Sequence, residues 1–238
     1  MNYSGKSGMD EIRKRFDQDV ERFSNLETGQ QTIIDAPLML DLVTRAALFV
    51  NPQAKQLLDI GCGAGNYTLK MLEKIPDLDC TLIDLSMPML NRARERVSAA
   101  TAGDVKIVQA DILKLPLREI QFDVVLAGSV MHHLRGTAEW TEVFRKIYQA
   151  LKPGGSFWIT DLVTQDSEPL NRLFSGQYAR HLESLGGEAY RDKVLEYIDH
   201  EDSPRSVTFQ LDLMKQAGFL YTEILHKNGN FAAFGGIK

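Results

Sequence analysis

The sequence predicts an α/β fold in which helices cover both faces of a mainly parallel sheet. Between about residues 56 and 160, short apolar segments alternate with amphipathic segments of helical period. The apolar segments are continuous rather than alternating, which is typical of strands buried on both faces. Because each strand is followed by a helix, parallel strands joined by crossover helices are expected.

A helical cover is expected ahead of this region, over residues 1–50. Ile12, Phe16, Val20 and Phe23 recur at helical spacing. A second helix should span residues 35–49, where Pro37 fits only in the first turn. A chain of 238 residues suits one large domain, and we assign residues 51–238 to it.

The alternating region supplies the first strands and helices in order. The expected strands are 56–60, 81–83, 105–110, 122–126 and 156–160, and the expected helices are 66–75, 88–97 and 137–151. Lys152-Pro153-Gly154-Gly155 should form a turn before the last of these strands.

A helical lid is expected over residues 163–206, where the alternation stops. Its apolar stripe consists of Leu170, Leu173, Phe174, Tyr178 and Leu182. The alternation resumes with a helix over 207–217 and strands over 221–226 and 231–237. Asn228-Gly229 between these strands is typical of a hairpin, so the sheet should end in an antiparallel pair.

The composition excludes several classes of protein. A net charge of −5 argues against a broad nucleic-acid surface. Two cysteines are too few for a disulfide framework and favour a reducing compartment. No apolar run approaches the roughly 18 residues of a membrane span. We therefore expect a soluble cytoplasmic protein without membrane contact, and we allow for a homodimer.

Three alternate glycines follow the first expected strand, in Asp59-Ile60-Gly61-Cys62-Gly63-Ala64-Gly65. Glycines permit a tight turn and close approach of a ligand, and the following helix offers free N–H groups to an anion. A nicotinamide site would carry another glycine where Asn66 stands. The motif therefore indicates a different nucleoside ligand.

Acidic residues stand at the ends of three successive strands: Asp59, Asp84 and Asp111. Parallel strands bind ligands at their carboxyl ends, where a carboxylate can accept both hydroxyl protons of a ribose. Each aspartate alone could instead cap a helix or turn. Together they predict a site for an adenosine with a short acidic tail and no diphosphate.

With these motifs, the sequence resembles the class I S-adenosylmethionine-dependent methyltransferases. The resemblance also rests on Phe122-Asp123-Val124-Val125, His132-His133-Leu134 and Leu151-Lys152-Pro153-Gly154-Gly155. It implies a Rossmann-like, seven-stranded, mostly parallel sheet with an antiparallel last strand.

The resemblance also implies the roles of individual residues toward S-adenosylmethionine. The loop after the first strand would hold the methionine portion of the cofactor. Residues at the end of the second strand would bind the ribose, those at the end of the third strand the adenine, and those at the end of the fourth strand would lie beside the sulfonium. The implied residues are, in that order, Asp59, Gly61, Cys62, Gly63 and Gly65; Asp84 and Leu85; Asp111 and Ile112; and Ala127, Gly128 and Ser129.

His132 and His133 follow the fourth strand, where the methyl group would point. One of them could act as a general base or bind the substrate, or both could simply pack or form hydrogen bonds in the loop. No further cysteine or histidine cluster lies nearby in the sequence, so no metal is expected.

The acceptor side is less defined. The tail resembles a subset that includes carboxy-S-adenosylmethionine synthases and wobble-uridine tRNA methyltransferases. In the synthases an arginine of the insertion holds a carboxylate, and Arg191 is the corresponding candidate. Gln30 stands where they carry a tyrosine, and Gly63 and Ala64 depart from their glycine motif. Gln30, Tyr178 and Arg191 are the substrate-binding candidates.

These observations favour methyl transfer from S-adenosylmethionine to an oxygen, nitrogen or carbon of a small molecule, with S-adenosylhomocysteine as product. A tRNA acceptor remains open through Arg180, His181, Arg191 and Lys193. The same motifs are also compatible with a synthase that modifies the cofactor and with a non-catalytic sensor of S-adenosylmethionine.

Overall fold

The computed structural model describes residues 5–25, 29–117 and 119–238, and within these ranges seven strands form one sheet in the order β3-β2-β1-β4-β5-β7-β6. β1 to β5 are parallel, whereas β7 is antiparallel to both β5 and β6. The strands are β1 Gln56–Ile60, β2 Asp79–Asp84, β3 Val105–Gln109, β4 Phe122–Gly128, β5 Leu151–Leu162, β6 Tyr221–Asn228 and β7 Phe231–Ile237. The predicted mostly parallel sheet with an antiparallel last strand is confirmed.

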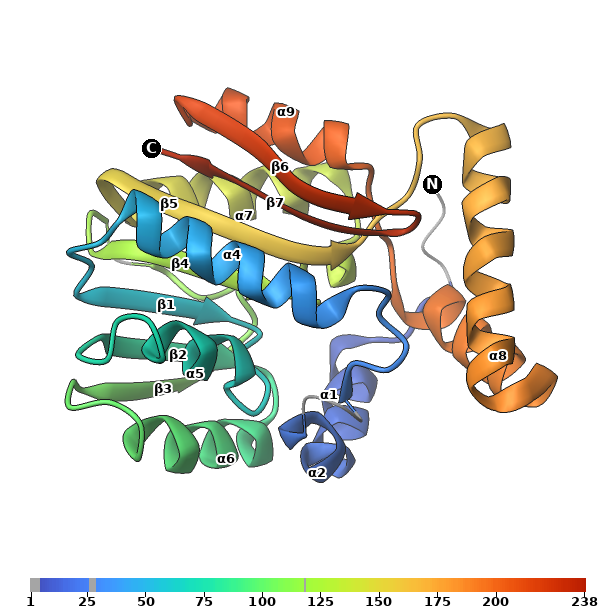
Figure 1. The fold of residues 1–238 in the computed structure, drawn as a ribbon, viewed down its shortest axis with the longest axis horizontal. Helices are drawn as coiled ribbons and strands as arrows, with labels where there is room; N and C mark the ends of the chain where they lie inside the picture. The colour runs from blue at the N-terminus through green and yellow to red at the C-terminus, as the bar shows by residue number, and fades with distance from the viewer. Residues whose placement is uncertain (1–4, 26–28, 118) are drawn as a thin grey trace.

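Helices cover both faces of this sheet (Figure 1). Side chains of α4, α5 and α6 share one buried cluster with one face, and side chains of α7 and α9 share a second cluster with the other. The helices are α1 Met9–Gln18, α2 Val20–Ser24, α4 Ala36–Val50, α5 Asn66–Leu72, α6 Met87–Ser98, α7 Thr137–Ala150, α8 Glu168–Glu201 and α9 Val207–Ala217. None of the helices in the described ranges is both long and apolar enough to cross a lipid bilayer.

The expected turn over Lys152-Pro153-Gly154-Gly155 is wrong, because β5 begins at Leu151 and runs through it. Leu151 pairs with Phe122, and the register shifts before the regular pairing of Ser156 with Val124. Gly154 has a φ of 76° and donates its N–H to the Lys238 carbonyl at 3.0 Å. The segment is therefore a bulge within β5, which hydrogen bonds between Lys238 and the two glycines hold at the end of the sheet.

The segment between β5 and α9 is mostly the helix α8, which is interrupted at Gly187 with a φ of 80°. Of the expected apolar stripe, Tyr178 and Leu182 are buried, whereas Leu170 and Leu173 remain 49% and 50% exposed. The first turns of α8 stand apart from the sheet, and its later turns approach α1 (Figure 1). Only the later part of the predicted stripe is therefore buried.

The described residues ahead of α4, which we call the leader, contain α1 and α2. These two helices lie at the carboxyl edge of β1, β2 and β3 (Figure 1). Arg15 of α1 contacts the end of α8, where its guanidinium donates to the Glu201 carboxylate and to the Tyr197 hydroxyl. Residues 1–4 and 26–28 of the expected cover lie outside the described residues. The leader and the end of α8 thus meet over the strand ends.

Candidate functional site

The loop after β1 is shaped by its glycines. Gly61, Gly63 and Gly65 have φ values of 64°, 51° and 84°, which L-residues with side chains rarely adopt. A Cβ on Gly61 would lie 2.4 Å from Cγ2 of Val130, so this glycine also lets the loops after β1 and β4 approach. The sequence motif therefore encodes both a turn and a close contact.

Asp84, at the end of β2, fastens this loop. Its Oδ2 accepts a hydrogen bond from the Gly63 N–H at 2.8 Å, and its Oδ1 accepts one from the Ser86 N–H at 2.8 Å. Burial raises the pKa of Asp84, although these backbone donors oppose the shift. The carboxylate thus joins the loops after β1 and β2, and Asp84 also lines the cavity at these strand ends.

Asp59 lies beneath the loop and is 1% exposed. Thr68 donates its hydroxyl to Oδ2 of Asp59 at 2.6 Å. Burial raises the pKa of Asp59 to about 7. Asp59 is therefore part of the support of the glycine loop, below the surface of the site.

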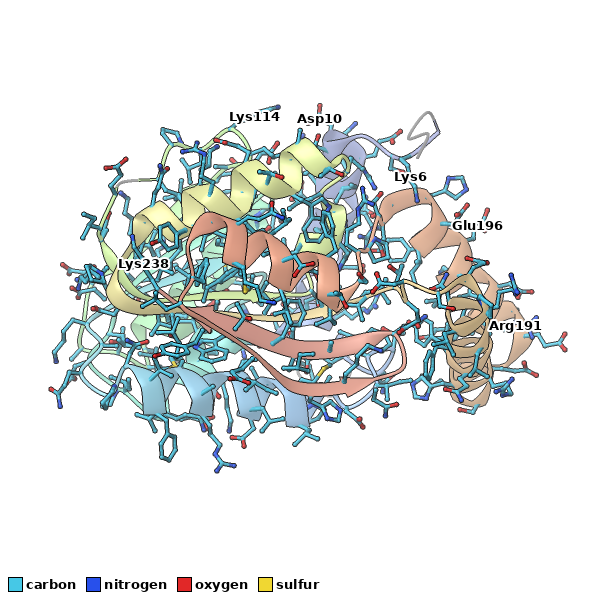
Figure 2. The ribbon with its side chains drawn as sticks, turned by 90° about the horizontal axis from the view of Figure 1, so that it is seen from above. Lys6, Asp10, Lys114, Arg191, Glu196 and Lys238 are labelled. Carbon is cyan, nitrogen blue, oxygen red and sulfur yellow. The ribbon has the colours of Figure 1, made fainter. Side chains whose placement is uncertain are left out.

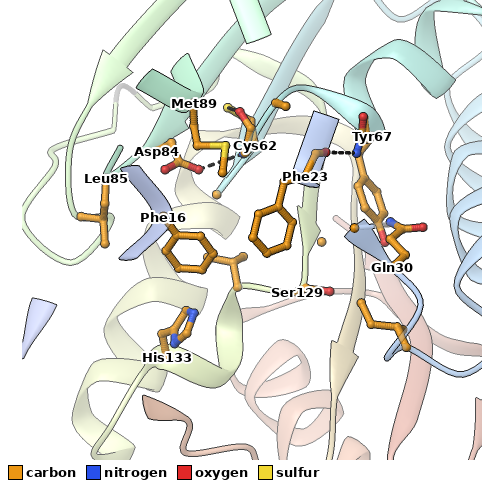
Figure 3. A pocket seen from close by; sticks show the side chains of 18 residues that line it. Phe16, Phe23, Gln30, Cys62, Tyr67, Asp84, Leu85, Met89, Ser129 and His133 are labelled. Atoms are coloured by element: carbon orange, nitrogen blue, oxygen red, sulfur yellow. Dashed lines mark hydrogen bonds between the residues drawn. The ribbon is translucent and has the colours of Figure 1, made fainter. Parts of the chain in front are cut away.

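A cavity of about 130 Å³ opens at these strand ends (Figure 3). Ser129, at the end of β4, reaches it with a left-handed φ of 55°. The predicted residues that line it are Gln30, Gly61, Cys62, Gly63, Asp84, Leu85, Gly128, Ser129 and His133. In the described part of the chain, Asp59, Gly65, Asp111, Ile112, Ala127 and Arg191 do not line it.

The end of β3 contributes less than expected to this cavity. Asp111 accepts a hydrogen bond from the Leu113 N–H at 2.9 Å, as a turn cap does. Ile112 is 9% exposed and belongs to the buried cluster under α7 and α9. Asp111 and Ile112 thus follow the end of β3 but do not line the cavity.

A second cavity, of about 690 Å³, lies between the leader, α8 and the ends of the strands. Tyr178, His132 and Ser129 contribute to it from three different segments. Six Phe and Tyr residues contribute to its wall: Phe16, Phe23, Tyr178, Tyr190, Tyr197 and Phe231. Phe16, Phe23, Gly29, Ile33 and Ser129 line both cavities, so the two adjoin.

His132 and His133 form the short 3₁₀ helix η1, Met131–His133, after β4. Nδ1 of His132 bonds to the Asp161 carboxylate, and the His132 N–H donates to Oδ2 of Asp161 at 3.0 Å. Burial alone would lower the pKa of His132, but the charges of Asp161 and Asp202 outweigh it and raise this pKa to about 9. Burial and the charge of His132 lower the pKa of His133.

Asp202, at the end of α8, completes a cluster that the sequence analysis missed. Its Oδ1 lies 3.3 Å from Nδ1 of His133 and 3.6 Å from Nε2 of His132. Ser203 fixes this approach by donating its N–H to the His132 carbonyl at 2.6 Å. The third potential metal ligand beside the two histidines therefore comes from a distant segment of the chain. A search for ligands close in the sequence could not find it.

Arg191 lies away from both cavities. Its guanidinium pairs with Glu183 and with Asp192, each at 2.8 Å. Figure 2 shows its side chain projecting from α8 at the edge of the molecule. Of the other substrate-binding candidates, Gln30 lines the first cavity and Tyr178 the second.

Several residues in the wall of the first cavity were not among those predicted from the sequence. They belong to the leader and to α5. Phe16 and Phe23 lie in the middle of the first cavity (Figure 3), and Asn66 and Tyr67 line it from α5. The helical spacing of Phe16 and Phe23 was visible. That spacing does not distinguish a face that packs on a core from one that closes a cavity.

Replacing Gly61 by alanine should destabilise the fold more than replacing Gly63. Both substitutions strain a left-handed backbone by roughly 1–2 kcal/mol. Only a Cβ at Gly61 meets Val130, since nothing lies within 4 Å of one at Gly63. Overpacking should add about 1–3 kcal/mol. Urea unfolding of Gly61→Ala and Gly63→Ala measures the difference, and equal losses would contradict the close contact.

The buried carboxyl of Asp59 should make the stability of the ligand-free chain fall as the pH rises. Its folded-state pKa of about 7 exceeds the ordinary value of 3.8, so the contribution is fully present below pH 3.8 and is lost as the pH rises through about 7. Asp59→Asn should therefore gain stability relative to the wild type between about pH 5 and pH 8, by urea unfolding.

Asp77→Asn provides the control, since it makes the same substitution at an exposed position. A difference between Asp59→Asn and the wild type that stays constant over this pH range would show that Asp59 is not protonated by burial.

Comparisons with known proteins agree with this geometry. Residues 57–155 match the family model of the methyltransferase domain. The demethylmenaquinone methyltransferase of Listeria monocytogenes is 28% identical over 187 residues, covering 76% of this chain and 77% of that protein.

Two solved structures share the fold. An O-methyltransferase family protein from Burkholderia thailandensis superposes with a TM-score of 0.66 at 18% identity, covering 97% of this chain and 60% of that one. Human N-acetylserotonin methyltransferase in complex with SAM gives 0.60 at 18%, covering 95% and 56%. The chain thus spans less than two thirds of either structure. Over residues 57–155 the chain is thus similar to a methyltransferase domain, and its motifs and strand order resemble those of the class I S-adenosylmethionine-dependent methyltransferases.

Proposed function

We propose that the chain binds S-adenosylmethionine at the first cavity and transfers its methyl group to a small molecule held in the second. The observation that carries this proposal is that the two cavities adjoin through Ser129, Phe16 and Phe23. Methyl transfer needs the acceptor atom in line with the sulfonium, and adjoining cavities can provide this alignment. The product left at the first cavity is S-adenosylhomocysteine.

In this proposal the loop from Gly61 to Gly65 receives the methionine portion and Asp84 the ribose. Asp84 accepts backbone hydrogen bonds from Gly63 and Ser86 and also lines the first cavity, where a carboxylate can accept from a ribose hydroxyl. The adenine would lie toward Leu85, with Asp111 and Ile112 at the next strand end. Ala127, Gly128 and Ser129 would flank the sulfonium.

The leader and the insertion would act as a cover that closes over the bound molecules. A cavity of about 130 Å³ is smaller than the 300 Å³ or more that ligand sites commonly offer. The rings of Phe16 and Phe23 line both cavities and lie in the middle of the first (Figure 3). We therefore propose that α1 and α2 shift outward when the cofactor binds, as mobile lids do.

The acceptor is best described as a planar, largely apolar small molecule. The second cavity, of about 690 Å³, has the size of a small-molecule site, and its wall is rich in aromatic rings. The relative's name, demethylmenaquinone methyltransferase, supports an acceptor that carries a ring. A wall that carries six aromatic residues and a net charge of −5 favour such a molecule over tRNA.

A synthase and a sensor have less support. A carboxy-S-adenosylmethionine synthase would need a cation near the cofactor's methyl group, and Arg191 is paired with two acidic residues away from both cavities. A sensor would need no acceptor space beyond the cofactor. The larger second cavity therefore favours an enzyme.

Replacing Asp84 by asparagine should weaken binding of S-adenosylmethionine by roughly 10- to 100-fold. The variant loses charge-assisted hydrogen bonds to the ribose, worth about 1–3 kcal/mol. Isothermal titration calorimetry measures the affinity. Asp79, at the opposite end of β2, also accepts a backbone hydrogen bond, from the Asp104 N–H at 2.8 Å. Asp79→Asn is thus a matched control. Equal affinities of the two variants for S-adenosylmethionine would show that Asp84 does not bind the ribose.

The nature of the acceptor can be tested with S-adenosylmethionine labelled in its methyl group. The protein is incubated with an extract of ring-containing metabolites, including quinols, or with bulk tRNA before and after RNase treatment. We expect label in a small organic product that survives RNase, because the second cavity has the size of a small-molecule site. Label that appears only in intact tRNA would overturn the small-molecule assignment, and binding without any turnover would favour the sensor.

A further inference from the structure

Three potential metal ligands converge where the two cavities adjoin. Nitrogens of His132 and His133 and a carboxylate oxygen of Asp202 lie within 4.8 Å of one another. The side chains are only 9%, 9% and 3% exposed. His132 and Asp202 line the second cavity, and His133 lines the first. The cluster therefore borders the space in which an acceptor would meet the cofactor.

Several polar atoms of this cluster lack a hydrogen-bond partner. Among the described residues, neither ring nitrogen of His133 makes a hydrogen bond, nor does Oδ1 of Asp202. Leaving a buried polar group unsatisfied costs about 1–3 kcal/mol, and folded proteins rarely do so. A bound group that accepts electron pairs from these atoms would remove this penalty.

The spacing of the atoms suits a metal ion better than direct hydrogen bonds. Oδ1 of Asp202 lies 3.3 Å and 3.6 Å from the two histidine nitrogens. In a tetrahedral site with bonds of 2.0–2.1 Å, ligand atoms lie about 3.4 Å apart. Hydrogen bonds between charged groups are about 2.7–2.9 Å long. The two distances from Asp202 match the spacing of ligand atoms around a tetrahedral metal ion.

Asp161 supplies the outer support that metal-binding histidines usually have. It holds Nδ1 of His132, which leaves Nε2 directed toward Asp202. Metal-ligating histidines commonly bond through their other nitrogen to a carboxylate in this way, which fixes the ring. The Asp161 side chain is fully buried, so it serves the cluster and not the solvent.

The charges of the cluster also fit a cation. Two buried carboxylates, Asp161 and Asp202, face the imidazoles. Arg15, which lines the second cavity, is bound to Glu201 at 2.8 Å and so already has its own counter-charge. A divalent ion with neutral imidazoles would balance the two carboxylates.

We propose that His132, His133 and Asp202 bind a divalent transition-metal ion whose remaining coordination position faces the second cavity. Two imidazoles and a carboxylate suit such ions and leave a position open in other enzymes. The link to the acceptor rests on the proposed function: an acceptor oxygen could take the open position, where the ion would favour its ionised form. The two histidines then hold an ion rather than removing a proton themselves.

Metal binding can be tested without cofactor or acceptor. The full chain is stripped with a chelator and titrated with Co²⁺, followed by visible absorption, and with Zn²⁺ by calorimetry. We expect one equivalent to bind and to give the absorption of tetrahedral Co²⁺. His133→Ala and Asp202→Asn should each weaken binding by more than roughly 100-fold, and Asp161→Asn by about 10- to 100-fold, since it acts only on His132.

His226→Gln is the matched control. Nε2 of His226 lies 2.8 Å from Asp35, so this variant removes another histidine–carboxylate pair outside both cavities. Its affinity for Co²⁺ should equal that of the wild type. Circular dichroism shows which variants are folded.

Proton NMR of the wild-type chain gives an answer that needs no variant. Paramagnetic Co²⁺ should shift the ring signals of His132 and His133 and leave those of His226 unchanged.

The absence of tetrahedral Co²⁺ absorption, or equal binding by wild type and folded Asp202→Asn, would overturn the proposal. The cluster would then be a network of protons and hydrogen bonds only. Failure of methyl transfer would not produce either result, because the titration contains no S-adenosylmethionine. The Asp84→Asn titration in turn tests the cofactor site without added metal.

Discussion

The carboxylate of Asp84 determines the shape of the site, because it ties the loop after β1 to the loop after β2. It does so through the N–H groups of Gly63 and Ser86, and only a buried acceptor with two oxygens can hold both. The glycines make the first loop possible, since Gly61 must pass close to Val130 with a left-handed backbone. The strand ends and the fastened loop together shape the first cavity.

The cover over this cradle comes from segments that lie outside the alternating strands and helices. The leader and the end of α8 meet through Arg15 and Glu201, and Ser203 binds the backbone of His132. The second cavity lies beside these polar contacts, and aromatic and charged residues together line it. Ile12 of α1 is also fully buried, so the leader is held by apolar as well as polar contacts. Under the proposed function, these contacts would have to loosen to admit a cofactor and an acceptor.

The site also concentrates buried polar groups that a stable core would avoid. Asp59, Asp161 and Asp202 are all buried, and the carboxyl groups of Asp59 and Asp202 have raised pKa values of about 7 and 6 because of burial. Buried ionisable groups reduce stability unless a ligand or partner compensates them. These buried carboxyl groups cluster at one edge of the sheet, next to the glycine loop. They lower the stability of the fold at the place where the proposed function needs polar groups.

The sequence alone determined the sheet, the glycine loop and the place of Asp84, because strand periodicity is local and the carboxyl ends of parallel strands meet at one edge. It could not show that Lys152 to Gly155 join β5, since pairing with distant strands decides that. Nor could it show that Asp161 and Asp202 surround the two histidines, or that Arg191 points away. Those contacts join segments far apart in the chain, and only the packing of α8 and the leader against the strand ends brings them together or keeps them apart.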